Sequence, residues 1–221
     1  MDTIICDIPV VFNLDQVAKV AGVRPGLGYD MLAEAESLFL QYARPKAVIK
    51  WVDIQAGENG TVFIDNTPFK SIIVSEKLNS LEKAIVFVVT AGTELEAIPE
   101  IEESILLKES LLMYSLMLAH GYVVEFVTEN FGYKDPGYLN PGSLPDWPIE
   151  NNFALFDILG PATEQIGVQI MESGYMQPWK SSSGIIFSDA SGYQNCILCK
   201  NLDCIGRRAP FDEAEYNRIF T

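Results

Sequence analysis

The chain has 221 residues, 48% of them hydrophobic and 20% charged, which is the composition of a globular protein and not of a disordered one. Its formal net charge of −15 argues against nucleic acid as a partner, because binding to phosphates needs clustered lysines and arginines. The one histidine, His120, excludes metal sites built on several histidines, and its apolar neighbours predict a hydrogen-bonded core residue.

A strand and two helices are predicted for the first part of the chain. Residues 3–12 are β-branched and apolar, as in a strand. Asn13 or Asp15 is placed to cap a short helix that ends at Gly22. Residues 31–42 have apolar side chains at helical spacing, which predicts one longer amphipathic helix.

Strands dominate the prediction for the next part. Residues 47–54 and 61–64 predict a hairpin, since a glycine-containing turn separates two β-branched runs. Residues 69–78 are ambiguous between a strand and a short helix. Residues 84–90 are apolar throughout, which predicts a strand buried on both faces.

A long helix from residue 105 to about residue 130 is apolar nearly all round, as a central core helix is. Its longest charge-free apolar run has fifteen residues, whereas a membrane span needs about 20, so we expect a soluble protein. Glu125 interrupts this pattern: it lies at the surface, or it is a paired, buried carboxylate that anchors a ligand. Residues 162–173 predict a second helix, and residues 185–187 a short strand.

Segment 138–160 combines a proline-rich loop with the start of a helix. Three prolines remove backbone donors, which excludes a central strand or a helix interior, and Gly137 and Gly142 permit sharp turns. Helical spacing after the last proline and the stop at Gly160 predict a short helix. The unpaired backbone N–H groups in the first turn of this helix would all point towards the same site. A ligand-binding loop and a tightly packed Ω-like connection both remain open.

Three of the four cysteines lie within nine residues: Cys196, Cys199 and Cys204. The first two are spaced to bind one ion from a tight turn, and the third is close enough to join them. The pattern predicts zinc or an iron–sulfur cluster, with a fourth ligand from Cys6, a carboxylate, a small molecule or a partner. Three reduced cysteines without a metal are the alternative. Arg207 and Arg208 would help to hold an anionic cluster.

Together these segments resemble the activation (reactivation) domain of cobalamin-dependent methionine synthase, in particular the small stand-alone proteins of that family. VTAGTELE (89–96) is similar to the family's strand, turn and helix, and NPGSLPDWPIE (140–150) to its proline–glycine loop. MQPWKSSSGIIFSDASGY (176–193) is similar to its closing Ser-Gly-aromatic motif. The helix with Tyr114, Ser115 and Glu125 is similar to the family's central helix. Closely spaced cysteines followed by Arg-Arg are a feature of the stand-alone versions.

The resemblance implies a fold and a ligand. The fold is α+β: a twisted, mainly antiparallel sheet flanked by helices, with a long core helix. Residues 1–221 would form a single domain with a cysteine-rich tail from about residue 194. The implied ligand is S-adenosylmethionine. The positions that match the family's contacts to it are Glu125, Tyr138, Asn140, Pro141, Gly142, Ser143 and Tyr193.

Tyr138 departs from the family's pattern. The family's loop begins with an arginine three residues before the proline of its Pro-Gly pair, and that arginine holds the carboxylate of the ligand. Tyr138 occupies this position, and a tyrosine donates one hydrogen bond where a guanidinium donates two in parallel. The substitution therefore predicts weakened S-adenosylmethionine binding.

The resemblance implies an accessory role in corrinoid-dependent methyl transfer. The protein would dock on a cobalamin-carrying protein or methyltransferase in the cytoplasm and help to return its oxidised cobalt to the active cycle. The cobalt would belong to the partner, so whether the chain is itself an enzyme stays open. The alternatives are a non-catalytic interaction module with a zinc-bound tail, and an iron–sulfur electron carrier on the same scaffold.

Overall fold

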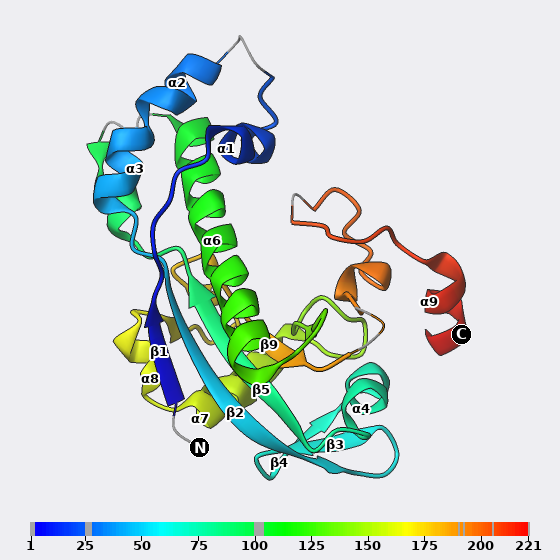
Figure 1. Cartoon of the computed structure of the whole chain (residues 1–221). Helices are drawn as coiled ribbons and strands as arrows, with labels where there is room; N and C mark the ends of the chain where they lie inside the picture. The colour runs from blue at the N-terminus through cyan, green and yellow to red at the C-terminus, as the bar shows by residue number, and fades with distance from the viewer. Residues whose placement is uncertain are drawn as a thin grey trace.

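A seven-stranded antiparallel sheet forms the centre of the computed structural model, which describes residues 3–24, 28–99, 104–189, 191, 193–204 and 206–220 (Figure 1). The strands follow the order β4-β3-β2-β5-β9-β6, and β1 pairs with the first half of β2. Their bounds are β1 (Thr3–Asp7), β2 (Lys46–Ala56), β3 (Thr61–Ile64), β4 (Thr67–Lys70), β5 (Lys83–Thr90), β6 (Gly137–Leu139) and β9 (Ser181–Phe187).

β5 lies in the middle of the sheet because its side chains are apolar on both faces. Every residue from Ala84 to Thr90 is buried. Val86 and Val88 belong to the core on one face, and Ile85 and Phe87 to the core on the other. β5 pairs with β2 on one side and with β9 on the other, so both faces need a covering layer.

Helix α6 (Ile105–Phe131) covers one face of the sheet (Figure 1). The Ser104 hydroxyl accepts the Leu107 N–H at its start, and Gly132 ends it in a left-handed conformation. Ala119, Val123 and Val127 pack on this face of the sheet. By length and composition alone α6 could cross a membrane, and here it serves as the core helix that the sequence predicts.

The opposite face is covered by shorter helices: α4 (Ile72–Leu78), α7 (Asn152–Leu159) and α8 (Ala162–Gln165). A two-stranded ribbon, β7 (Gln169–Ile170) with β8 (Met176–Gln177), follows α8. Three helices near the N-terminus pack with the first half of α6 around Phe39 and Tyr114. They are α1 (Leu14–Ala21), α2 (Tyr29–Glu34) and α3 (Glu36–Tyr42).

The predicted fold class is confirmed, whereas three local predictions change. The predicted helix 31–42 is broken at Ala35 into α2 and α3. The predicted helix 162–173 is wrong: α8 stops at Gln165, because Gly167 takes a φ of +76° and the chain then enters β7. Residues 69–78 contain both candidate structures, the end of β4 and then α4.

Candidate functional site

Strand β6 and the loop after it form one edge of the site. β6 pairs only with β9 in the described ladders, so it ends the sheet. The loop folds back on itself through a hydrogen bond from the Gly142 N–H to the Trp147 carbonyl at 2.8 Å. Gly142 has a φ of +78°, and a Cβ there would lie 3.1 Å from the Ile149 side chain. A turn this tight needs glycine. Gly137, in contrast, has no positive φ and lies in the strand.

The loop is packed on its inner side and open on its outer side. Trp147 is fully buried and contacts Phe69. Asp146 accepts the N–H groups of Ile72 and Ile73 at 2.6 and 3.4 Å, which ties the loop to the start of α4. The loop is thus a packed connection, and it also presents Asn140, Pro141 and Ser143 to a cavity, so ligand binding by the loop stays a prediction.

The C-terminal segment (residues 193–220) begins along the outer side of β6. The Tyr138 N–H donates to the Tyr193 carbonyl at 3.3 Å, and Tyr138 forms a parallel bridge with Gln194. Asn195 continues this pairing with its side chain. In the orientation that gives both of its polar groups a partner, the Asn195 side-chain amide donates to the Tyr138 carbonyl at 2.7 Å, and its oxygen accepts the Asn140 N–H at 2.6 Å. The segment is thereby fixed beside the loop.

Arg207 holds the cysteine-rich part of this segment together. Its guanidinium donates to four carbonyl oxygens, those of Cys196, Cys199, Asn201 and Ala209, at 2.7, 2.7, 2.7 and 3.0 Å. The next residue, Arg208, donates its backbone N–H to the Cys196 sulfur at 3.3 Å. Hydrogen bonds from a charged donor are stronger than neutral ones, so one side chain organises a stretch with little regular structure.

A cavity of about 440 Å³, here called the loop cavity, lies between the loop and the C-terminal segment. One wall is polar and continuous: the Asn140 amide donates to the Ser183 carbonyl at 2.7 Å, and the Ser183 hydroxyl donates to Asn152 at 2.5 Å. An exposed aromatic pair, Tyr175 and Trp179, stands at its rim with ring centroids 5.9 Å apart. The C-terminal segment lines the other wall with Cys196, Cys199, Cys204, Arg207 and Arg208.

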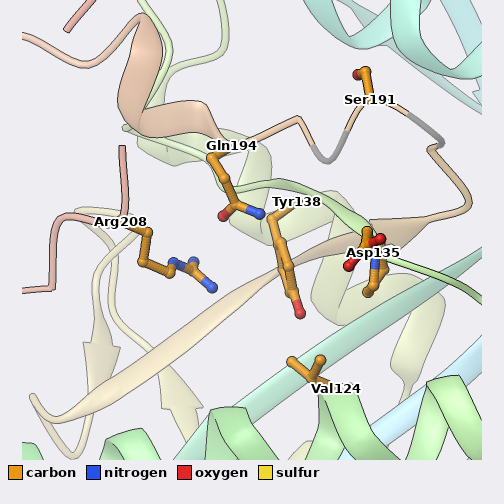
Figure 2. Close-up of a pocket in the computed structure, with 7 residues that line it drawn as sticks. Val124, Asp135, Tyr138, Ser191, Gln194 and Arg208 are labelled. Atoms are coloured by element: carbon orange, nitrogen blue, oxygen red, sulfur yellow. The ribbon is translucent and has the colours of Figure 1, made fainter. Parts of the chain in front are cut away.

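A second cavity of about 470 Å³, here called the Tyr138 cavity, lies where the C-terminal part of α6 meets β6 (Figure 2). Its lining comes from distant parts of the chain: Val124, Asp135, Pro136, Tyr138, Ser191, Gln194 and Arg208. The Tyr138 side chain points towards Val124 in this view, with Arg208 on one side of it and Asp135 on the other (Figure 2). Burial raises the pKa of Tyr138, an effect that Arg208 opposes, so the hydroxyl stays neutral at physiological pH.

Arg208 lines both cavities. Its guanidinium carbon lies 4.6 Å from the centre of the Tyr138 ring, a cation–π contact. His120, one helical turn before Val124, packs edge-on against Phe87 at 5.6 Å between ring centres. Burial, and then the charge of Arg208, lower the pKa of His120 to about 4. His120 is therefore neutral at physiological pH, as a core histidine is.

The structure brings some of the predicted ligand residues together and separates others. Asn140, Pro141 and Ser143 line the loop cavity, and Tyr138 lines the other cavity. Glu125 is exposed on α6, next to Val124, which decides between its two interpretations. Tyr193 is buried between Phe187 and Lys77 and lines neither cavity. Ala190 and Gly192 of the segment 176–193, and Ile205 and Thr221 of the tail, lie outside the described residues.

The three clustered cysteines share the loop cavity, but they do not form a metal centre as they stand. Among the described residues, no three histidine, cysteine or acidic side chains are close enough together to hold one ion. Cys6 is buried in β1, in the core under α6, and is not part of this cavity. A metal on the three thiols would require the segment to close around it.

Sequence reasoning missed Asn152 and Ser183 as cavity residues, and it assigned Arg208 only to the cysteine cluster and not to Tyr138. Asn152 is at a position that the sequence assigns to a helix, and Ser183 lies just before the predicted strand 185–187; neither position carries a signal that its side chain faces a cavity. Arg208 had a signal, since it is one of only 15 basic residues in a chain with 30 acidic ones. Its position over Tyr138 depends on the path of the C-terminal segment, which no local pattern predicts.

The chain has the fold of a known domain. The solved structure of the MetH reactivation domain bound to AdoHcy (S-adenosylhomocysteine) matches it with a TM-score of 0.58 over 85% of this chain and 78% of that chain, at 15% sequence identity. No protein-family model matches the sequence. No curated protein matches it either. The likeness is therefore one of fold.

Proposed function

We propose that the chain binds S-adenosylmethionine, or its demethylated product S-adenosylhomocysteine, beside β6 and the proline–glycine loop. The observation that carries the proposal is the shared fold with a domain whose structure contains AdoHcy. Two cavities flank β6 and its loop in this chain, and both have volumes in the range of small-molecule sites.

The lining of the two cavities suits a nucleoside joined to an amino acid. The loop cavity offers amide and hydroxyl groups for ribose and base, from Asn140, Ser143 and Ser183. The aromatic pair at its rim offers a face for a planar base. The Tyr138 cavity offers a carboxylate, Asp135, and a guanidinium, Arg208, for the charged end of the ligand. The predicted contacts of Glu125 and Tyr193 need rearrangement, since neither side chain lines a cavity.

The proposed role is that of a cytoplasmic accessory protein in corrinoid-dependent methyl transfer. The bound ligand would supply a methyl group to reduced cobalt carried by a partner protein, and S-adenosylhomocysteine would remain. The chain's own residues would hold the ligand and the partner, while the reacting metal and its corrinoid would stay with the partner. Any enzymatic activity would then belong to the complex.

Two measurements test this proposal. Calorimetry should show binding of S-adenosylhomocysteine by the purified chain, and Asn140→Ala should weaken it, whereas Glu58→Ala, an exposed change in a distant turn, should not. In the second, the chain is added to a corrinoid protein with oxidised cobalt, a reductant and S-adenosylmethionine. Faster recovery of the methylated cobalt spectrum is expected. Absence of binding, together with an unchanged cobalt spectrum for corrinoid proteins tested, would contradict the proposal.

A second candidate concerns the C-terminal segment alone. Because Cys196, Cys199 and Cys204 line one cavity, we keep zinc or an iron–sulfur cluster as a proposed ligand of this segment. This metal proposal does not depend on S-adenosylmethionine binding. A zinc-bound segment would serve an interaction module, whereas an iron–sulfur cluster would serve an electron carrier. Metal analysis of anaerobically purified protein distinguishes zinc from an iron–sulfur cluster, because a cluster colours the protein brown and zinc does not.

A further inference from the structure

Arg208 is one of three basic residues, among those that the structure describes, whose charge lies over an aromatic ring, with Lys77 over Tyr193 and Lys200 over Tyr216, and of these three Arg208 lines the two cavities. Four basic side chains form ion pairs among the described residues, those of Lys50, Lys83, Lys180 and Arg218. Arg207 satisfies its charge on carbonyl oxygens. The Arg208 side chain is exposed, and within the described part of the chain its guanidinium forms no ion pair, although acidic residues outnumber basic ones two to one.

The position of this unpaired charge is fixed from two directions. The backbone N–H of Arg208 donates to the Cys196 sulfur, and the preceding residue is tied to four carbonyls. The guanidinium then lies over the Tyr138 ring, which is 3% exposed and held in β6. Because a cation–π contact needs no oxygen acceptor, the N–H donors of this guanidinium remain available to an anion.

The surroundings leave Arg208 as the cation that faces the Tyr138 cavity. His120 lies near enough to feel its charge but is neutral at physiological pH. Asp135 lines the same cavity without forming an ion pair with Arg208. A fixed, planar pair of donors at the wall of a cavity suits an anion with two coplanar oxygens.

We propose that Arg208 binds the carboxylate of an amino-acid ligand in the Tyr138 cavity, with the Tyr138 ring as its support. The inference rests on the proposed function and adds the orientation of the ligand: its amino-acid end lies at the C-terminal segment. The positive charge for this contact comes from Arg208 in the C-terminal segment. The loop cannot supply it, because Tyr138 is neutral.

The test compares two nucleosides that differ at the proposed contact. S-Adenosylhomocysteine carries the carboxylate, and 5′-methylthioadenosine lacks it. In calorimetry, Arg208→Gln should weaken the affinity for S-adenosylhomocysteine by roughly 10- to 100-fold and leave the affinity for 5′-methylthioadenosine unchanged. Arg218→Gln, which removes an exposed arginine of helix α9 (Glu213–Phe220), should change neither affinity. Adding Tyr138→Arg to Arg208→Gln should restore part of the lost affinity, because it returns a guanidinium to the same cavity.

Three outcomes count against the inference in distinguishable ways. Unchanged S-adenosylhomocysteine affinity in Arg208→Gln overturns it directly. Equal loss for both nucleosides shows that Arg208 only holds the segment in place, and also overturns it. If the wild type binds neither nucleoside, the proposed function fails, and the contact is tested alone with L-methionine. The Arg208 side-chain N–H signal in NMR should shift on this titration, and no shift would overturn the contact as well.

Discussion

The two walls of the loop cavity are built on different physical principles. The first, here called the sheet wall, is formed by the loop, Asn152 and β9, and it is backed by the sheet, whose central strand β5 is buried along nearly its whole length with apolar clusters on both faces. The wall formed by the C-terminal segment depends more on charge, since Arg207 donates to four carbonyls and Arg208 makes a cation–π contact with Tyr138, while Leu198, Tyr216 and Phe220 pack at the core. Helix α9 (Glu213–Phe220) at its end has no buried residue.

This contrast teaches that one wall is a fixed surface and the other can open separately. Local opening is cheapest where little buried area would be lost: Tyr193 and Leu198 join the core, whereas no described residue after Leu198 is buried. Damage to the sheet should therefore affect the whole fold, whereas damage to the segment should remain local. The following predictions test that difference, in order of decreasing effect.

Phe87→Ala should have the largest effect, because the ring is fully buried between β5 and α6. We expect a loss of about 3–5 kcal/mol in the free energy of unfolding, measured by chemical denaturation. Far-UV dichroism and fluorescence should report one shared transition. Val11→Ala serves as the control, since Val11 is 57% exposed. A loss below about 1 kcal/mol would mean that the sheet core is not the main source of stability.

Arg207→Ala should act on the segment alone. It removes the donor to four carbonyls, and we expect a loss of about 2–4 kcal/mol of local stability, discounted for the partial exposure of the side chain. Native-state hydrogen exchange should show faster exchange within residues 196–209 and unchanged protection in β5. Faster exchange in β5 by a similar factor would show that the two walls are one cooperative unit.

His120 lies at the boundary between the two regions, and its pKa predicts a dependence of stability on pH. Its ordinary pKa of 6.5 is lowered to about 4 in the fold, first by burial and then by Arg208. The unfolded chain therefore binds more protons between these values, so this contribution is present above pH 6.5 and is lost as the pH falls towards 4. The loss amounts to at most about 3–4 kcal/mol, from about 2.5 pH units at about 1.4 kcal/mol each.

His120→Gln provides the measurement. The difference in unfolding free energy between wild type and variant should narrow or reverse from pH 6.5 to pH 4, because only the wild type loses this contribution. Carboxylates titrate in both proteins and cancel in the difference. A constant difference over this range would show that His120 is already accessible to protons in the folded state.

Cys199→Ser should have the smallest effect on the fold. We expect the sheet to keep its stability, and any zinc or iron found in the wild type to be lost, since a hydroxyl is a far poorer ligand than a thiolate. Metal analysis and thiol titration of both proteins check this. Wild-type protein with no metal and three freely titrating thiols in the segment would contradict the metal prediction.

Much of the sheet wall could be predicted from the sequence, because its signals are local. Asn13 caps α1 through the Gln16 N–H, and Gly22 ends it in a left-handed conformation, as predicted. The apolar run of β5 and the all-round apolar pattern of α6 gave the two central elements. The break at Ala35 was not predictable, since Ala and Glu around it favour helix, and Leu32, Ala35 and Phe39 still face one cluster.

The wall formed by the C-terminal segment could not be predicted in the same way. Its contacts join residues far apart in the chain, such as Arg208 with Tyr138 and Asn195 with Asn140. Tyr193 shows the limit most clearly: sequence placed it near the ligand residues, and its backbone does pair with Tyr138. Its side chain turns to the other face of the sheet, towards Lys77, and that choice of face depends on packing.

Residues 193–195 cover the outer side of β6, where another molecule could otherwise pair with the sheet. A strand with free N–H and C=O groups on one side is a template for another chain. Here the last strand of the sheet has that side covered by the chain's own downstream residues, including an amide side chain that imitates a peptide group. A chain cut before Tyr193 would leave this side bare, and self-association through β6 would follow. The C-terminal segment is thus also a guard against aggregation.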